Sequence, residues 1–337
     1  MSVPEPPFEH LLRLSDDTGV LEHARGAVPR RRDGYCTDDA ARALVVIGRQ
    51  PSPPAALTVL AERCLAFLMH AQRGDGASHN RLGYDRRWED RPGLGDWWGR
   101  SLWASGTAAA RGRSARFRGD ALVHFETGAA CRSPAPRAMA FAALGAAEVL
   151  TVRSDHGPAR DLLKAAGAVL SAPGDGSWPW PEPRLTYANA HWAEALLATG
   201  SALDDDQLAE QGLRLLDWLL EVETAGGRLS LTPVGGWGPG EPRPGFDQQP
   251  IEAAALADAC ARAFLLTGNI GYIAGLNRAV AWFLGDNDTQ VPMYDAQTGG
   301  GYDGLERDGR NDNQGAESTI ALISTLQQGI RLIGGHP

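Results

Sequence analysis

The feature that most constrains the fold is a loop rich in Gly, Asp and Trp that leads directly into a long apolar helix and recurs along the chain. The clearest copies are 174–182, which precede a helix near 186, and 299–304, which precede a helix near 314. Self-similarity at a spacing longer than that of the common solenoid repeats indicates stacked supersecondary units. We therefore expect the helices to build the core and the loops to gather on one face, where function is usually found.

Apolar residues recur with helical periodicity through most of the chain, and almost no segment has the alternation of a strand. Residues such as Thr37 and Pro136 mark helix starts, and glycines such as Gly268 mark helix ends. With a short helix around 5–14, the pattern predicts twelve helices that pair in sequence into six antiparallel hairpins. The other predicted helices are 37–50, 55–72, 97–112, 117–131, 135–152, 157–171, 186–200, 204–223, 247–267, 270–285 and 314–333.

Two classes of predicted helix differ in composition, and the difference indicates which layer each occupies. One class is rich in Ala and other small residues, which permit close approach of helix axes; its members begin near 37, 97, 135, 186, 247 and 314. The other class alternates Leu with charged residues, as expected of an outer layer, and its members lie near 55, 157, 204 and 270. We therefore predict a single all-α domain over residues 1–337, a ring of inner helices enclosed by outer helices, with long loops at one mouth.

The acidic composition excludes several classes of function. With 32 basic and 41 acidic residues the formal net charge is −9, which argues against nucleic-acid binding because phosphate contacts depend on clustered Lys and Arg. No apolar run has the length of a membrane span and the amino terminus lacks the features of a secretory signal, so we expect a cytoplasmic protein. The four cysteines lack metal-ligand spacing, and we expect neither a metal nor a cofactor.

Four sequence blocks are similar to those of a known family, namely 35–44, 178–190, 246–252 and 313–319. They resemble the signature blocks of a bacterial family of the six-hairpin glycosidase-like superfamily, whose members occur with or fused to glycosyltransferases. The resemblance implies an (α/α)6 toroid, an oligosaccharide or glycoconjugate ligand such as a mannoside, and a glycosyltransferase partner. This chain has Ala40 where the family pattern has Asn, so a role for that amide does not transfer. Since it also lacks phosphate-binding glycine motifs, we expect a companion of a transferase rather than a transferase.

Carboxyl groups at the starts of the predicted inner helices are candidates for catalysis. Hydrolysis of a glycoside needs a protonated carboxylic acid beside the leaving oxygen and a carboxylate that activates water or attacks carbon. Glu182 and Glu317 are the candidates for the general acid, and Asp39 and Asp247 are the candidates for the base. The alternative for acids in a first helical turn is that they only satisfy free backbone amides.

The same loops and helix starts supply candidate sugar-binding groups. Indole rings stack well on the faces of pyranose sugars, and tryptophans are unusually frequent in these loops. For Glu252, the alternative to sugar binding is a structural role as a buried acid paired with a cation. The predicted substrate-binding residues are Tyr35, Asp38, Asp96, Trp97, Trp98, Arg100, Trp178, Trp180, Tyr187, Asn189, His191, Gln248, Glu252, Asp303 and Gln314.

Two alternatives to a glycoside hydrolase remain open at this point. A non-catalytic glycan-binding partner of a glycosyltransferase is favoured if the carboxylates are all locked in pairs with arginine. A sugar 2-epimerase requires a base and an acid on opposite faces of the reacting carbon, and His79 and His191 are the pair placed to provide them. We expect these two imidazoles to face each other across the cavity if the protein is an epimerase.

Overall fold

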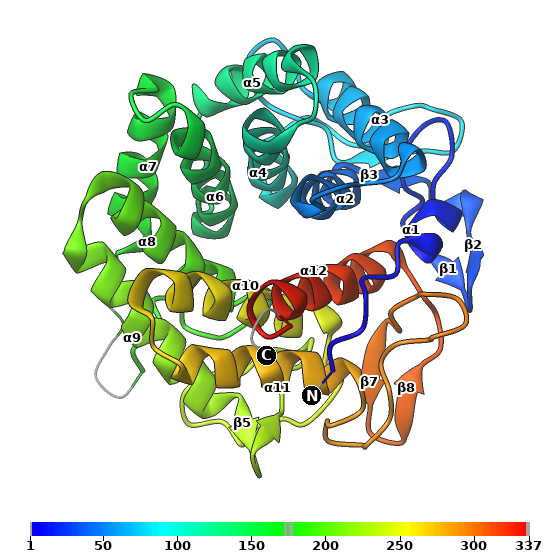
Figure 1. Cartoon of the computed structure of the whole chain (residues 1–337), viewed down its shortest axis with the longest axis vertical. Coiled ribbons are helices and arrows are strands. Elements are labelled where there is room, and N and C mark those ends of the chain that lie inside the picture. The colour runs from blue at the N-terminus through cyan, green and yellow to red at the C-terminus, as the bar shows by residue number, and fades with distance from the viewer. Residues whose placement is uncertain (1, 172–173, 175–177, 335–337) are drawn as a thin grey trace.

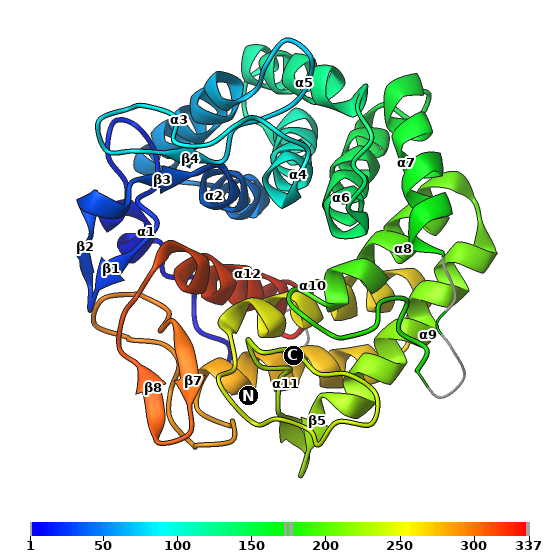
Figure 2. The same cartoon turned by 180° about the vertical axis from the view of Figure 1, so that it is seen from behind.

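The computed structural model describes residues 2–171, 174 and 178–334, in which the helices form a closed ring of two concentric layers (Figures 1 and 2). The inner helices are α2 (Thr37–Arg49), α4 (Asp96–Arg111), α6 (Pro136–Val152), α8 (Ala190–Leu203), α10 (Pro250–Thr267) and α12 (Ala316–Leu332). The outer helices are α3 (Ala55–Ala71), α5 (Ala115–Ala129), α7 (Gly157–Leu170), α9 (Asp206–Val222) and α11 (Gly271–Phe283), with the short α1 (Glu9–Arg13) against α3 and α12. No helix among these residues is both long and apolar enough to cross a membrane.

The ring closes because α12, the last inner helix, packs against α2, the first, as well as against α10. Each of the other inner helices also contacts its two inner neighbours. Consecutive inner and outer helices form antiparallel hairpins, so every inner helix begins at the same mouth of the ring and ends at the other. The predicted (α/α)6 toroid is confirmed, including the assignment of helices to the inner and outer layers.

Burial separates the two layers as the composition predicted. In α6 14 of the 17 residues are buried, whereas in α9 only 4 of the 17 are buried. An inner helix is enclosed on all sides by neighbours and by the ring interior, and a helix that is apolar all round is stable only in such a place. An outer helix buries a single stripe and leaves its charged face in water.

Eight short strands were not predicted, because two or three residues cannot display an alternating pattern. They form antiparallel pairs: β1 (Ala24–Arg25) with β2 (Val28–Pro29), β3 (Tyr35–Cys36) with β4 (Arg81–Leu82), β5 (Thr224–Ala225) with β6 (Arg228–Leu229), and β7 (Gly304–Glu306) with β8 (Gly309–Asn311). In the second pair Tyr35 lies opposite Leu82, which ties the start of α2 to the loop before α4. These strands therefore hold together the loops at one mouth of the ring.

Helix starts differ most from prediction where a long loop precedes an inner helix. Helix α8 begins at Ala190 rather than near 186, because Asn189 Oδ1 accepts a hydrogen bond from the amide of Thr186 at 3.0 Å and holds that segment as a turn. Helix α1 is shorter than the predicted 5–14. Most of the 174–177 part of the loop motif lies outside the described residues.

Helices α4 and α6 pack with their backbones in close contact at two glycines. A Cβ atom at Gly106 would lie 2.2 Å from the carbonyl oxygen of Gly145, and one at Gly145 would lie 2.2 Å from the carbonyl oxygen of Leu102. Both distances are far shorter than a van der Waals contact, and the obstacle in each case is backbone, which moves only if the helix moves. The two glycines therefore set the separation of two inner helices.

We expect Gly106→Ala to lower the free energy of unfolding by about 2 kcal/mol, since overpacking of a close-packed interior costs roughly 1–3 kcal/mol. Gly119→Ala is a matched control, because Gly119 is exposed within α5 and a Cβ atom there would meet nothing within 4 Å. That control should stabilise the protein by up to about 1 kcal/mol through helix propensity. Urea unfolding followed by circular dichroism measures both changes, and equal effects at the two glycines would contradict the close approach.

Candidate functional site

The amino-terminal ends of the six inner helices meet at one mouth of the ring, here called the loop-side mouth, which faces the viewer in Figure 2. A carboxylate near a helix amino terminus is stabilised by the helix dipole and by free backbone amides. First turns of four inner helices carry such acids, namely Asp38, Asp39, Asp96, Glu252 and Glu317. The closed ring thus brings acids from distant parts of the sequence to one mouth.

Arg42 of α2 joins two of these acids. Its Nη2 donates to Asp39 Oδ1 at 2.7 Å, and its Nη1 donates to Glu317 Oε2 at 2.6 Å. Asp39 is only 2% exposed, and burial raises its pKa to about 6 in spite of Arg42. Desolvation by the surrounding ring opposes ionisation of Glu317, but Arg42 outweighs it and holds the pKa of Glu317 below its usual value. Glu317 keeps 41% of its side chain accessible, so it presents an ionised carboxylate to the mouth.

Arg100 of α4 lies beside Asp38 at the same mouth. Its Nε is 3.2 Å from Asp38 Oδ1, and its guanidinium lies 4.2 Å from the centre of the Phe141 ring. Arg100 is buried, yet its Nε and Nη1 have no hydrogen-bond partner among the residues that the structure describes. Buried donors in proteins are nearly always paired. Nε is held by the ion pair with Asp38, whereas Nη1 is left without a described partner.

Asp96 differs from Asp38 and Glu317 because no arginine among the described residues pairs with it. Its Oδ2 accepts a hydrogen bond from the hydroxyl of Tyr187 at 2.5 Å. Burial raises the pKa of Asp96, while the Tyr187 bond and the charge of Arg100 oppose that shift. Tyr187 is 40% exposed. Asp96 is thus half-buried, and its surroundings favour the protonated carboxyl group more than bulk water would.

The loop before α8 is fixed to α6 by Arg137. The Arg137 guanidinium donates to the carboxylate of Glu182, to the carbonyl oxygen of Tyr187 and to Asn189 Oδ1. The guanidinium also lies 4.8 Å from the centre of the Tyr187 ring. Glu182, a predicted general acid, is therefore paired with a guanidinium.

Glu252 fixes the end of the same loop from inside the ring. It accepts hydrogen bonds from the backbone amides of Ala188 and Asn189 and from Asn189 Nδ2. Glu252 is 2% exposed, and burial, with a contribution from the charge of Glu223, raises its pKa to about 8. The structure therefore favours the alternative that Glu252 is structural, since all its contacts serve the loop.

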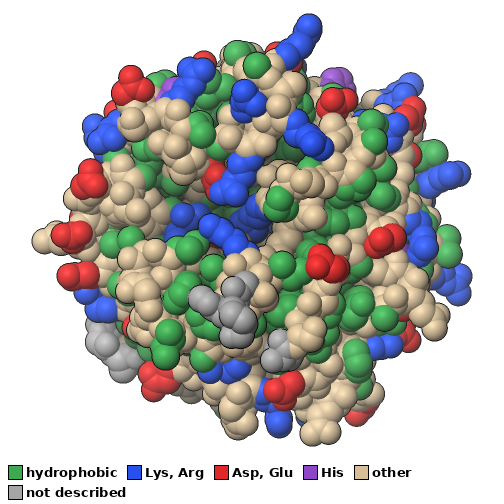
Figure 3. Space-filling model, in the orientation of Figure 1, with side chains coloured by type: hydrophobic (Ala, Val, Ile, Leu, Met, Phe, Trp, Pro, Cys, Tyr) green, Lys and Arg blue, Asp and Glu red, His purple; other side chains and the backbone are tan. Residues whose placement is uncertain are grey.

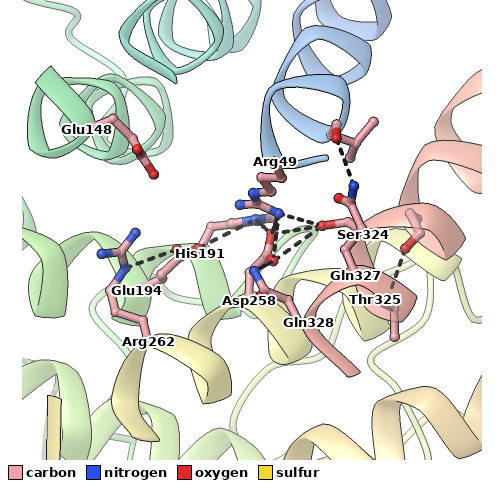
Figure 4. A network of polar contacts seen from close by, with 12 residues as sticks. Arg49, Glu148, His191, Glu194, Asp258, Arg262, Ser324, Thr325, Gln327 and Gln328 are labelled. Atoms are coloured by element: carbon pink, nitrogen blue, oxygen red, sulfur yellow. Dashed lines mark hydrogen bonds and ion pairs between the residues drawn. The ribbon is translucent and has the colours of Figure 1, made fainter. Parts of the chain in front are cut away.

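In Figure 4 His191 lies beside Glu194 and Asp258. His191 also borders a cavity of about 30 Å³, here called the axial cavity, whose lining includes Arg42, Arg100 and Glu317. Its Nε2 is 3.9 Å from Glu194 Oε2 and 3.8 Å from Asp258 Oδ2. Neither ring nitrogen has a hydrogen-bond partner within the described part of the chain. The cavity is large enough for a single water molecule.

His191, Glu194 and Asp258 also offer ligand atoms within 4.8 Å of one another, a spacing that a metal ion could use. Arginines occupy both carboxylates, however. Arg49 Nη1 donates to both oxygens of Asp258 at 2.9 and 3.1 Å, and Arg262 Nε donates to Glu194 at 3.1 Å. Two guanidinium charges repel a bound cation. Glu22, Cys36 and Asp39 form a second group with this spacing. The same objection applies there, because Arg81 pairs with Glu22 and Arg42 pairs with Asp39.

Sequence reasoning missed Arg42, Arg49, Glu194 and Asp258. Arg42, Glu194 and Asp258 lie inside Ala-rich stretches of inner helices, as in the run Ala257-Asp258-Ala259, and Arg49 ends the apolar run of α2. A charge at such a position is rarely tolerated without a partner. That signal was present in the sequence, but the partners come from other helices and cannot be paired from spacing alone.

Four predicted binding residues are engaged in contacts of their own and do not reach the mouth as free groups. Tyr35 donates to Asp16, and Gln248 binds Asp288 and accepts from the indole of Trp282. Asp303 accepts from Gly315 and Ser318 at the start of α12, and Gln314 contacts Asp295 and Thr298. Gln248 and Asp303 fix loops to helices α11 and α12, whereas Tyr35 and Gln314 join segments outside the helices.

Asp247, a predicted base, is exposed, and its side chain forms no hydrogen bond or ion pair with any described residue. Its carbonyl oxygen accepts from Val234 at 2.8 Å, and the adjacent Gln248 is directed to the outer helix α11. The structure thus gives no link between Asp247 and the other acids.

The predicted tryptophan platform is not open to a ligand. Trp98 and Trp180 are 0% and 1% exposed, and Trp178 packs edge-on against Trp218 with ring centres 5.1 Å apart. Trp97 is half-buried and donates to the carbonyl oxygen of Ser78 at 2.6 Å. Loop position was a poor guide because these loops have cores of their own. Tyr187 is the accessible aromatic ring beside Asp96.

The two predicted imidazoles do not face each other. His79 stacks on Trp88 with ring centres 4.9 Å apart, in the loop between α3 and α4, and its Nδ1 contacts the carbonyl oxygen of Asp90. His191 packs edge-on against Trp103 and Phe141 on the ring axis. Within the described residues, His191 is therefore the histidine that lines the axial cavity.

Comparison of the sequence with protein-family models and with curated proteins found no match. The fold is similar to solved structures. One is a sugar epimerase from a ruminal bacterium, with a TM-score of 0.74 and 11% identity over 98% of this chain and 96% of that chain. A second is D-mannose isomerase, with a TM-score of 0.71 and 12% identity over 96% of this chain and 94% of that chain. A third is a GH76 alpha-mannanase from Bacteroides thetaiotaomicron, with a TM-score of 0.60 and 10% identity over 89% of this chain and 88% of that chain. At these identities the likeness shows the toroid fold alone.

We expect Asp39 to make the stability of the protein fall as pH rises from about 4 to about 6. Its folded-state pKa, about 6, lies above the unfolded value, so the folded state binds the proton more tightly and loses stability when that proton leaves. Relative to Asp39→Asn, the native protein should lose up to about 3 kcal/mol over this range. Chemical unfolding at several pH values measures the difference.

Glu317→Gln is the control of opposite sign. Because Arg42 lowers the folded-state pKa of Glu317, the native protein should gain stability relative to this variant as pH rises through the unfolded pKa. The same slope for both variants would contradict the assigned environments.

Proposed function

We propose that this chain is a carbohydrate-active enzyme that binds a sugar at the loop-side mouth and hydrolyses a glycosidic bond. The observation that carries the proposal is the contrast between Asp96 and Glu317 at that mouth. Asp96 is half-buried, hydrogen-bonded to a phenol and shifted toward the protonated form, whereas Glu317 is accessible, paired with Arg42 and shifted toward the carboxylate. Carboxyl groups whose surroundings drive their pKa values apart are the usual basis of acid and base roles at one pH.

In this proposal Asp96 donates a proton to the leaving oxygen as the bond to the anomeric carbon breaks. Glu317 either removes a proton from the water that attacks this carbon or attacks the carbon itself. The charge of Arg100 lowers the pKa of both groups. Arg100, its partner Asp38 and the exposed Tyr187 are suited to hold sugar hydroxyls.

The other acids predicted for catalysis take supporting roles. Asp39 is buried behind Arg42 and orients it, and Glu182 is held by Arg137. The assignment of the general acid therefore moves from Glu182 to Asp96, while Glu317 stays in the site as base rather than acid. Asp247 has no place in this mechanism.

A sugar epimerase or isomerase is the second candidate, favoured by His191. Its imidazole borders the axial cavity that Glu317 also lines, so a histidine and a carboxylate, groups that serve proton transfer to and from carbon, lie near each other. Support also comes from likeness over nearly the full length to a sugar epimerase and to D-mannose isomerase. The His79 and His191 pair is not part of this candidate, since His79 lies in the outer loop.

The hydrolase is tested with a panel of chromogenic glycosides and manno-oligosaccharides. We expect Asp96→Asn and Glu317→Gln each to lower kcat by about 100-fold or more, because a positioned acid or base contributes roughly 10²–10⁴. Asp120→Asn is a matched control on the outer helix α5, where the side chain is 53% exposed. Full activity of both site variants would exclude the mechanism.

The alternatives are separated by incubating mannose and cellobiose with the protein in deuterium oxide. An epimerase or isomerase that transfers protons incorporates deuterium at carbon, whereas a hydrolase releases free sugar without this exchange. We expect hydrolysis without exchange. Exchange that His191→Asn abolishes would establish the second candidate, and saccharide binding with neither reaction would favour a glycan-binding partner of a glycosyltransferase.

A further inference from the structure

A second hollow lies at the opposite mouth of the ring, here called the rear mouth, where the six inner helices end. It encloses about 740 Å³, within the range of small-molecule binding sites. Figure 3 looks into this mouth and shows basic side chains gathered in the central hollow.

Four arginines from four inner helices line the rear hollow, namely Arg49, Arg111, Arg262 and Arg331. Three buried acids partner three of them. Arg111 binds both oxygens of Glu148 at 2.9 and 3.0 Å, and the pairs of Arg49 with Asp258 and of Arg262 with Glu194 are described above. The remaining acid of the lining, Glu5, is exposed at the rim.

Arg331 is the unmatched cation of this set. It forms no ion pair and no hydrogen bond with any residue that the structure describes. Partial burial lowers its pKa, and the charges of Arg111, Arg49 and Arg262 lower it further. Four guanidinium groups are thus close enough to repel one another, and the acids present leave one of them without a partner.

Free donors on the other arginines point to the same conclusion. A guanidinium has five N–H donors. Arg111 uses Nε and Nη2 on Glu148 and leaves Nη1, while Arg262 uses Nε on Glu194 and leaves both Nη groups free of described partners. Their side chains are 39% and 30% accessible, so a ligand can reach these donors from water.

We propose that the rear hollow binds a small organic anion through a phosphate or carboxylate group held by Arg331, Arg111 and Arg262. Guanidinium forks match the oxygens of both groups. The lining also includes the partly exposed Leu265 and Leu266, which provide an apolar wall for the body of the ligand. This site does not depend on the reaction proposed for the loop-side mouth.

The test uses the full chain and isothermal titration calorimetry with three probes, namely inorganic phosphate, mannose 6-phosphate and benzoate, with uncharged mannose for comparison. We expect the anions to bind, with an affinity that falls as salt is added. The Arg331→Gln variant should weaken binding at least tenfold. Because Arg331 is exposed and has no described partner, this variant should keep the melting temperature of the native protein. Tighter binding of mannose 6-phosphate than of benzoate would identify a phosphate site, and the reverse a carboxylate site.

Two control variants locate the bound anion. Arg116→Gln removes an arginine that is 93% exposed on the outer helix α5 and should leave binding unchanged. Arg100→Gln removes a guanidinium at the loop-side mouth and should also leave anion binding unchanged. The proposal is overturned if no anion binds, if Arg331→Gln binds as tightly as the native chain, or if Arg100→Gln rather than Arg331→Gln abolishes binding.

Discussion

Charge pairing between inner helices is the interaction on which the interior of this ring depends. Arginines and acids face the axis from helices that are otherwise packed with Ala and Leu, and an unpaired charge there would be costly. Arg42 with Glu317, Arg49 with Asp258 and Arg262 with Glu194 each join two different inner helices. On one side of these pairs lies the loop-side mouth with its accessible acids. On the other side lies the rear mouth, where Arg331 has no acidic partner among the described residues.

The sequence was sufficient for the architecture because each inner helix carries its own signal. The Ala-rich runs of α6 and α10 specify close-packed inner helices, and the mixed pattern of α9 specifies the outer layer. Boundaries were harder, since the start of α8 is set by a hydrogen bond from Thr186 to Asn189 rather than by periodicity. Strands of two residues gave no pattern to detect.

The site was only partly predictable, because pairing between distant helices decides what each group can do. Position alone placed Asp38, Asp96 and Glu317 at the loop-side mouth, and this much follows from helix starts. Nothing in the spacing indicated that Glu182 would be held by Arg137. Trp180 was misjudged for a related reason, since a tryptophan in a loop can be as buried as one in a helix.

The contact of α12 with α2 has a consequence for the order in which the molecule can be completed during synthesis. Arg42 and Glu317 are 275 positions apart, so their ion pair cannot form until α12 has been synthesised and has left the ribosome. Until then the flank of α2 that receives α12 stays uncovered, and its apolar side chains are open to aggregation or to a chaperone. Glu317, a candidate catalytic residue, therefore reaches the site only when α12 packs on α2 and closes the ring.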